Sequence, residues 1–213
     1  MISAAGWLLA SYLVGAIPTS YLVARVFRGI DLREHGSRNL GATNVYRVLG
    51  WRYAIPVGVV DAAKGAVAIW VFGPRGPGGT VFPLLCGLGA VVGHTLSAFV
   101  GFKGGKGVAT AAGVVLALSP WAFAAALALW AVLVRLTGYV SVGSVTAAAL
   151  FPAMAYVLGE ARGPVLLLEI ALALVIIAKH RSNLARLARG TENRFGRRGG
   201  EVGGPGKVAG RPS

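Results

Sequence analysis

The sequence predicts an all-α integral membrane protein, built as a bundle of about seven transmembrane helices, some of them short. Of its 213 residues, 55% are hydrophobic and only 13% are charged, and the mean hydropathy is +0.68. Several apolar runs approach the ~20 residues that a helix needs to cross ~30 Å of hydrocarbon. The 32 glycines suit the close helix packing that lipid favours.

Basic residues give the chain a formal net charge of +14, a balance that also occurs in nucleic-acid-binding proteins. All but three of the 21 lysines and arginines fall in residues 25–52, 103–106, 135 and 179–211. This clustering in alternate connections follows the positive-inside rule, which places the N-terminus outside and the C-terminus in the cytoplasm. Topology therefore accounts for the charge, and we expect no nucleic-acid partner.

The first half of the chain reads as three crossings. Residues 2–25 form a retained first helix, because no basic residue precedes Arg25 as it would in a cleaved signal peptide. A polar loop of about 27 residues follows, which is long for a helix connection. Residues 53–72 return across the membrane, residues 73–79 turn outside, and residues 81–99 cross back.

The second half begins with an apolar run, residues 108–134, that Pro120 interrupts. A single crossing would place Arg135 outside, so we expect two short helices that each span only ~17–21 Å. Residues 139–158 and 164–178 complete the seven helices.

Residues 1–195 thus form one transmembrane domain. Residues 196–213 combine glycine, proline and basic residues without apolar periodicity, which predicts a disordered basic cytoplasmic tail. The single cysteine, Cys86, excludes an intramolecular disulfide and any CxxC metal motif, and we expect no metal site.

Three unusual segments meet the cytoplasmic face under this topology, and they predict a cytoplasm-facing site. They are GSRNLGATNVYR at 36–47, GHTLSAFVGFKGGKGVAT at 93–110 and KHRSNLARLARGTE at 179–192. Residues 102–107 place two lysines among three glycines just before a helix, where free backbone N–H groups and the helix dipole can hold phosphate. The spacing is not that of a nucleotide-hydrolysing P-loop.

Together these segments resemble the three motifs of the bacterial membrane acyl-phosphate:glycerol-3-phosphate acyltransferase family (PlsY), over essentially residues 1–195. The combination GSxNxGATN…R, GHxxSxFxxFKGGKGVAT and HxxNxxRLxxGxE is highly specific. One departure is Arg38, where family members usually carry glycine. The resemblance implies seven helices, an active site facing the cytoplasm of the bacterial inner membrane, and no cofactor.

The implied reaction transfers a fatty acyl group from acyl phosphate to glycerol 3-phosphate, giving lysophosphatidic acid and inorganic phosphate. Partners are these two substrates, the lipid bilayer and the enzyme that supplies acyl phosphate. The expected catalytic residues are Ser37, Arg47 and His94. Groups expected to bind phosphate or orient substrate are Asn44, Lys103, Gly104, Gly105, Lys106, Ser141, His180, Asn183 and Glu192.

The proton acceptor stays open at this level. His94 can take the hydroxyl proton or position a substrate, and the resemblance also implies that the donor phosphate itself accepts the proton. Ser37 can hydrogen-bond a phosphate or the developing oxyanion, and a covalent role for it is disfavoured because the donor is already activated.

Charged groups inside the predicted helices have structural interpretations. Asp61 and Lys64 lie three residues apart on one helix face. This spacing favours a structural ion pair over a proton pathway. Glu169 is compatible with a transport function or with packing against a polar partner in the bundle. Ser141 corresponds by resemblance to a site serine, or it caps a helix. The basic run of Arg181, Arg186 and Arg189 is equally compatible with a solvated membrane-surface face.

A small-ion or phosphate transporter is the main competing class, because short helices and intramembrane charge also mark transport paths. No inverted repeat is evident, and the polar motifs collect on one face. A coenzyme A-dependent acyltransferase is disfavoured, because the position five residues after each histidine holds Leu40, Phe99 or Ala185 rather than aspartate.

Overall fold

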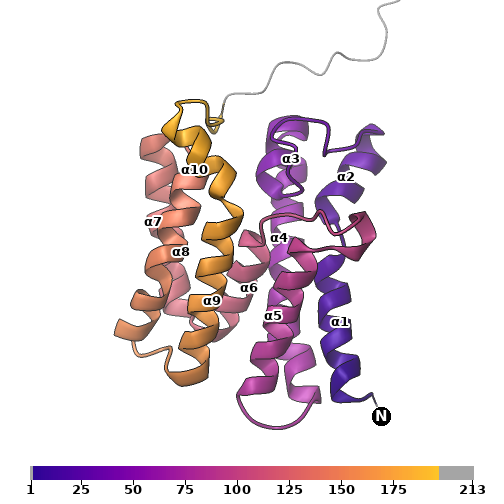
Figure 1. Cartoon of the computed structure of the whole chain (residues 1–213), viewed down its shortest axis with the longest axis vertical. Helices are drawn as coiled ribbons and strands as arrows, with labels where there is room; N and C mark the ends of the chain where they lie inside the picture. The colour runs from indigo at the N-terminus through magenta and orange to yellow at the C-terminus, as the bar shows by residue number, and fades with distance from the viewer. Residues whose placement is uncertain (1, 197–213) are drawn as a thin grey trace, which may run out of the picture.

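The computed structural model describes residues 2–196, and all regular elements within this range are helical. The helices run mostly side by side along one long axis (Figure 1). In chain order they are α1 (Ala4–Ala16), α2 (Thr19–Arg28), α3 (Ala42–Leu49), α4 (Trp51–Val67), the π-helical η1 (Ala68–Phe72), the 3-10 helix η2 (Gly73–Arg75), α5 (Val81–Thr95), the 3-10 helix η3 (Ala98–Val100), α6 (Val108–Leu118), α7 (Pro120–Thr137), α8 (Val140–Val157), α9 (Gly163–Lys179) and α10 (Arg181–Ala188).

Four helical stretches in the described part of the chain are long and apolar enough to cross a membrane: Trp51–Arg75, Val81–Val100, Pro120–Thr137 and Val140–Val157. Counting each of the bent pairs α1–α2 and α9–α10 as one span raises the number to six. The apolar α6, with 11 residues, is a seventh segment that is too short to span alone. The predicted all-helical membrane bundle is confirmed, whereas the exact number of crossings stays a prediction.

The first crossing is broken, so the expectation of one continuous helix over residues 2–25 is wrong. The chain bends by 41° between α1 and α2, where Ile17 and Pro18 separate the two helices. Proline cannot continue the hydrogen-bond ladder and disfavours a helical residue before it. The ammonium of Lys64 on α4 donates to the Ile17 carbonyl at 2.6 Å and to Thr19 Oγ1 at 2.5 Å, which replaces the missing helix bonds.

Two further expectations about element lengths need correction. The polar loop is partly helical, because α3 occupies its last third. The break at Pro120 is present, but α7 has 18 residues and spans about 27 Å, so only α6 is short. Glu160 helps define the start of α7, since its carboxylate oxygens accept from the backbone N–H groups of Trp121 and Ala122 at 3.0 and 2.7 Å.

Glycines allow α4 and α6 to pack closely. A Cβ at Gly65 would lie 2.1 Å from the Thr110 carbonyl oxygen, and one at Gly113 would lie 1.8 Å from that of Ala62. Only glycine allows backbones to approach this closely, and such pairs are typical of helix packing in lipid. The contact aligns the start of α6 with the face of α4 that carries Asp61.

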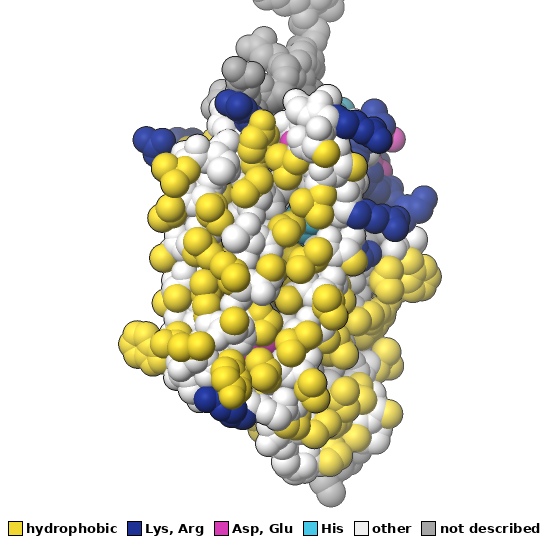
Figure 2. All heavy atoms as spheres, turned by 60° about the vertical axis from the view of Figure 1, so that its left-hand side comes forward, with side chains coloured by type: hydrophobic (Ala, Val, Ile, Leu, Met, Phe, Trp, Pro, Cys, Tyr) yellow, Lys and Arg dark blue, Asp and Glu magenta, His cyan; other side chains and the backbone are white. Residues whose placement is uncertain are grey.

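Charge and apolar surface are separated along the long axis. Figure 2 shows hydrophobic side chains over the sides of the bundle and most lysines and arginines at one end, which carries α10. α2 and α3 lie at this same end, and the N-terminus lies at the opposite one (Figure 1). Residues 197–213, which hold nearly all of the predicted tail, lie outside the described residues.

Candidate active site

A polar cavity of about 260 Å³ opens within the charged end of the bundle and collects side chains from all three polar segments. The structure brings together all but three of the twelve residues predicted for the site. Its lining includes Ser37, Asn44, Arg47, His94, Lys106, Ser141, His180, Asn183 and Glu192.

Lys103, Gly104 and Gly105 are the three predicted residues that do not line this cavity. The Lys103 side chain is exposed. A Cβ at Gly104 would lie 2.0 Å from the His94 carbonyl oxygen, and one at Gly105 would lie 2.3 Å from that of Leu40. The Gly105 N–H donates to the His94 carbonyl at 3.0 Å, so it is not free for phosphate. These glycines let the loop pack against His94 at the end of α5 and against Leu40, and the phosphate-binding role expected for them stays a prediction.

Three helix N-termini face the cavity instead. Its lining includes the first residues of α3, α6 and α8, namely Ala42, Val108 and Val140. None of these helices has a side-chain cap or an acidic residue in its first turn. Unpaired N–H groups and the positive ends of the helix dipoles therefore favour an anion in this space.

Glu192 organises the third segment. Its side chain is 2% exposed. Oε1 accepts from Ser141 Oγ at 3.0 Å and from Asn183 Nδ2 at 2.6 Å. Oε2 accepts from Arg186 Nε at 2.7 Å. This network shows that Ser141 is a hydrogen-bond donor within α8 rather than its cap. It also gives Arg186 a defined partner, whereas the sequence was equally compatible with a solvated Arg186.

Two cations border the cavity with hydrogen-bonding capacity to spare. Lys106 Nζ donates to Asn183 Oδ1, and burial lowers the Lys106 pKa to about 8, opposed by Glu192 and reinforced by Arg186 and Arg47. Arg47 donates from Nη2 to the Asn193 carbonyl at 3.4 Å. Its buried Nε has no partner within residues 2–196, and burial lowers its pKa from the ordinary value.

Asn44 shapes the first segment rather than presenting a free amide. Its Oδ1 accepts from the Ser37 N–H at 2.8 Å, and its Nδ2 donates to the His35 and Leu32 carbonyls at 3.0 and 3.3 Å. The loop therefore holds the Ser37 side chain at the cavity wall. Arg38 follows with a φ of 60°, a left-handed conformation that glycine adopts without steric cost. The loop keeps a glycine-like geometry despite the arginine.

His94 lines the cavity, with Asp61 and Gly105 beside its ring. Nδ1 lies 3.9 Å from Asp61 Oδ1, and Nε2 lies against Gly105, where an added Cβ would approach it to 2.4 Å. Asp61 also accepts from Lys64 at 2.6 Å, which confirms the predicted ion pair. Sequence spacing excluded a His–Asp dyad of the coenzyme A-dependent type, whereas the fold brings a carboxylate from another helix beside this histidine.

His180 is buried, and its Nδ1 lies 2.8 Å from the Ile176 carbonyl, which leaves Nε2 for the cavity. Four further residues line the cavity that the sequence analysis did not select: Asn39, Thr43, Trp130 and Ser144. Asn39 and Thr43 lie within the first motif, and that position could have identified them. Within the described range, no group of three or more histidines, cysteines or carboxylates is arranged to hold a metal ion.

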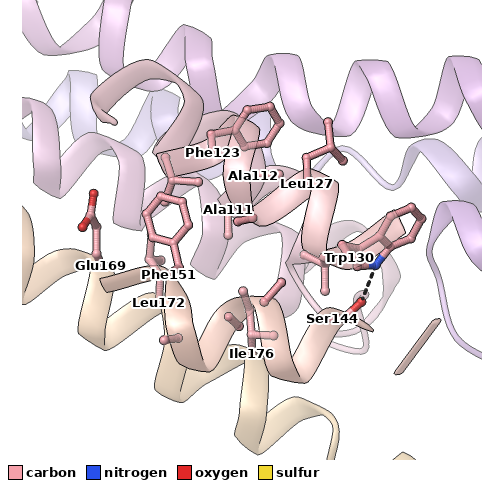
Figure 3. Close-up of a pocket in the computed structure, with 16 residues that line it drawn as sticks. Ala111, Ala112, Phe123, Leu127, Trp130, Ser144, Phe151, Glu169, Leu172 and Ile176 are labelled. Atoms are coloured by element: carbon pink, nitrogen blue, oxygen red, sulfur yellow. Dashed lines mark hydrogen bonds between the residues drawn. The ribbon is translucent and has the colours of Figure 1, made fainter. Parts of the chain in front are cut away.

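A second, apolar cavity of about 190 Å³ adjoins the polar one between α6, α7, α8 and α9 (Figure 3). Both cavities are lined by Val108, Trp130 and Ser144, so they share a wall. Trp130 Nε1 donates to Ser144 Oγ at 3.3 Å at this junction. The junction therefore separates a space with cationic groups from a space lined almost wholly by apolar side chains.

Comparison with known proteins identifies the family. The family model described as glycerol-3-phosphate acyltransferase matches residues 5–190. A glycerol-3-phosphate acyltransferase of Desulforudis audaxviator is 46% identical over 185 residues, covering 87% of this chain and 92% of the relative. Crystal structures of PlsY, an integral membrane glycerol 3-phosphate acyltransferase, are 38% identical in both the glycerol 3-phosphate and the lysophosphatidic acid forms.

The two crystal structures superpose with TM-scores of 0.82 and 0.80, and each alignment covers 91% of this chain and 96% or 95% of the crystallised chain. The fold and the length therefore agree with those of an integral membrane glycerol 3-phosphate acyltransferase. This chain belongs to the glycerol-3-phosphate acyltransferase (PlsY) family and is an acyltransferase.

Proposed function

We propose that this enzyme transfers a fatty acyl group from acyl phosphate to glycerol 3-phosphate, giving lysophosphatidic acid and inorganic phosphate. The observation that carries the proposal is the shared wall between the polar, cationic cavity and the apolar cavity. The relatives are named for glycerol 3-phosphate, and the two similar crystal structures are a glycerol 3-phosphate form and a lysophosphatidic acid form.

Two phosphate groups must be accommodated, and the polar cavity offers separate positive groups for them. Arg47 supplies its guanidinium, whose Nε has no partner among residues 2–196, on the side of α3, where the N-terminal N–H groups of that helix also face the cavity. Lys106 lies next to the start of α6. We assign Arg47 and Lys106 to the phosphates, because charge-assisted bonds from both would orient two anions beside one another.

In the reaction, a glycerol hydroxyl oxygen forms a bond to the acyl carbonyl carbon, and the bond from that carbon to the phosphate oxygen breaks. The donor is a mixed anhydride whose acyl group is already activated, so the reaction needs no covalent acyl-enzyme intermediate before phosphate leaves. Ser37 Oγ, held at the cavity wall by the Asn44 contact, is positioned to donate to a phosphate or to the developing oxyanion.

The hydroxyl proton must move to a base as the new ester forms. His94 lines the cavity, but its Nδ1 lies 3.9 Å from Asp61 Oδ1, too far for the hydrogen bond that would orient the ring as a base. A phosphate oxygen of the donor lies next to the reacting hydroxyl by necessity and carries negative charge. We therefore assign proton transfer to the donor phosphate. The backbone carbonyl of His94, which accepts from the Gly105 N–H at 3.0 Å, helps to hold the loop that carries Lys106.

The site would face the cytoplasm, with the N-terminus outside. Most basic side chains lie at the end of the bundle that holds the polar cavity, and the positive-inside rule places such an end in the cytoplasm of the inner membrane. Glycerol 3-phosphate would arrive from the cytosol. A separate enzyme would supply the acyl phosphate, which would reach the site through the bilayer. We expect no nucleic-acid partner.

The test uses purified full-length enzyme in detergent, labelled glycerol 3-phosphate, and palmitoyl phosphate or palmitoyl-coenzyme A as donor. We expect lysophosphatidic acid only with palmitoyl phosphate. Turnover with the coenzyme A donor and none with the phosphate would refute the donor assignment. Uptake of glycerol 3-phosphate into proteoliposomes without product formation would favour a transporter instead.

A further inference from the structure

Glu169 on α9 is a carboxylate in the wall of the apolar cavity, and the reaction described above does not use it. It is 1% exposed. The other lining residues are apolar apart from the Trp130–Ser144 pair at the junction with the polar cavity. Burying a carboxylate in such surroundings is costly, so its position calls for a partner or a function.

One carboxylate oxygen is fixed and the other is not. Oε1 accepts from Ser119 Oγ at 2.6 Å, and Ser119 is fully buried at the break between α6 and α7. Oε2 is buried and has no hydrogen-bond partner in the described part of the chain. The side chain is therefore anchored and holds one buried oxygen that has no hydrogen-bond partner among the described residues.

Glu169 lies at the end of the apolar cavity opposite Trp130 and Ser144 (Figure 3). The distance along α9 can be estimated from the sequence. His180, in the polar cavity, is eleven residues from Glu169, which corresponds to ~16 Å of helix. An extended hydrocarbon chain advances ~1.3 Å per carbon, so this path accommodates on the order of a dozen carbons beyond the phosphate site.

We propose that Glu169, held by Ser119, is the polar end of the acyl-chain cavity and sets the longest fatty acyl chain that the enzyme uses well. This inference rests on the proposed function, which places the acyl chain in the apolar cavity. A methyl terminus that reaches Glu169 ends against an anchored carboxylate. Each further methylene would have to displace that group or bend back, and one methylene in a hydrophobic pocket changes specificity by about tenfold or more.

The test measures kcat/KM for acyl phosphates of 12, 14, 16 and 18 carbons with wild-type enzyme and two variants. Glu169→Ala removes the polar end, and the ratio of kcat/KM for the 18-carbon donor over the 14-carbon donor should rise by at least about tenfold, the effect of a single methylene. Glu169→Asp keeps the carboxylate but shortens the side chain by one methylene, so the ratio should rise by a smaller factor.

Two controls separate this effect from a general disturbance of α9. Glu169→Gln keeps the size and polarity of the side chain, and its ratio should stay within about twofold of wild type. Leu167→Ala removes an apolar side chain that is 68% exposed on the same helix, and its ratio should not change. Turnover of the 12-carbon donor shows that a variant is folded.

A wild-type ratio in both Glu169→Ala and Glu169→Asp would overturn the inference, because the chain terminus would then lie elsewhere. Should Glu169→Ala not fold, Glu169→Asp decides alone. Failure of the proposed function looks different: wild-type enzyme would use none of the acyl phosphates. In that case the same length series, repeated with acyl-coenzyme A donors, would still support or refute the role of Glu169.

Discussion

Lys106 and Lys103 belong to one glycine-rich loop, but only Lys106 lines the polar cavity. Replacing Lys106 with alanine removes a cation that the proposed mechanism assigns to phosphate. A hydrogen bond to a charged group contributes about 1.5–3 kcal/mol, so kcat/KM should fall by about 10- to 150-fold. Lys103→Ala is the matched control, because Lys103 is exposed, and its kcat/KM should stay within about twofold of wild type.

The pH dependence gives an independent measure of the same group. Burial lowers the Lys106 pKa to about 8 in the enzyme without substrate, so the charge is lost as the pH rises through 8. The second pKa of a phosphate monoester is about 6, so glycerol 3-phosphate stays a dianion over this range. We expect kcat/KM to decline above pH 8, and Lys106→Arg should move that decline to higher pH because arginine stays protonated.

Stability should change in the opposite direction over this range. An unfolded lysine titrates near its ordinary value of 10.5, so between pH 8 and 10.5 the unfolded chain binds more protons than the folded one. Lys106 then makes the folded state more stable as the pH rises, and its deprotonation cannot cause unfolding.

The assay is steady-state formation of labelled lysophosphatidic acid by purified variants, with the thermal midpoint Tm measured alongside. Wild-type kcat/KM in Lys106→Ala together with a large loss in Lys103→Ala would refute the assignment of the two lysines. A decline at pH 8 that persists unchanged in Lys106→Arg would show that another group titrates.

Three further perturbations test the fold and its orientation. Arg38→Gly should raise Tm by about 2 °C with activity retained, because glycine adopts the φ of 60° without strain; a lower Tm would contradict this. Lys64→Met should destabilise the protein by about 3–5 kcal/mol by leaving Asp61 buried and unpaired, and the double variant with Asp61→Asn should recover most of the loss in a Tm measurement. A cysteine at Gly78 should react with an impermeant external reagent and one at Glu34 should not; the reverse pattern would invert the proposed topology.

The sequence alone determined the class of the molecule and the region of its site. Each side chain meets the bilayer almost independently of the others, so hydropathy and the distribution of basic residues predict helices and their ends without knowledge of packing. The break at Pro120, the short α6 and the Asp61–Lys64 pair followed from local rules. The three motifs identified the family before any contact was known.

Only the tertiary structure decided which residues meet. Whether Lys103 or Lys106 faces the cavity depends on the packing of Gly104 and Gly105 against the His94 carbonyl and Leu40, which no spacing rule encodes. The approach of Asp61 to His94 joins two helices, and the bond from Arg186 to Glu192 joins α10 to the segment after it. The direction in which a side chain of an irregular loop points is set by contacts with residues distant in the sequence. Hydropathy, by contrast, is a property of each residue that can be read from the sequence alone.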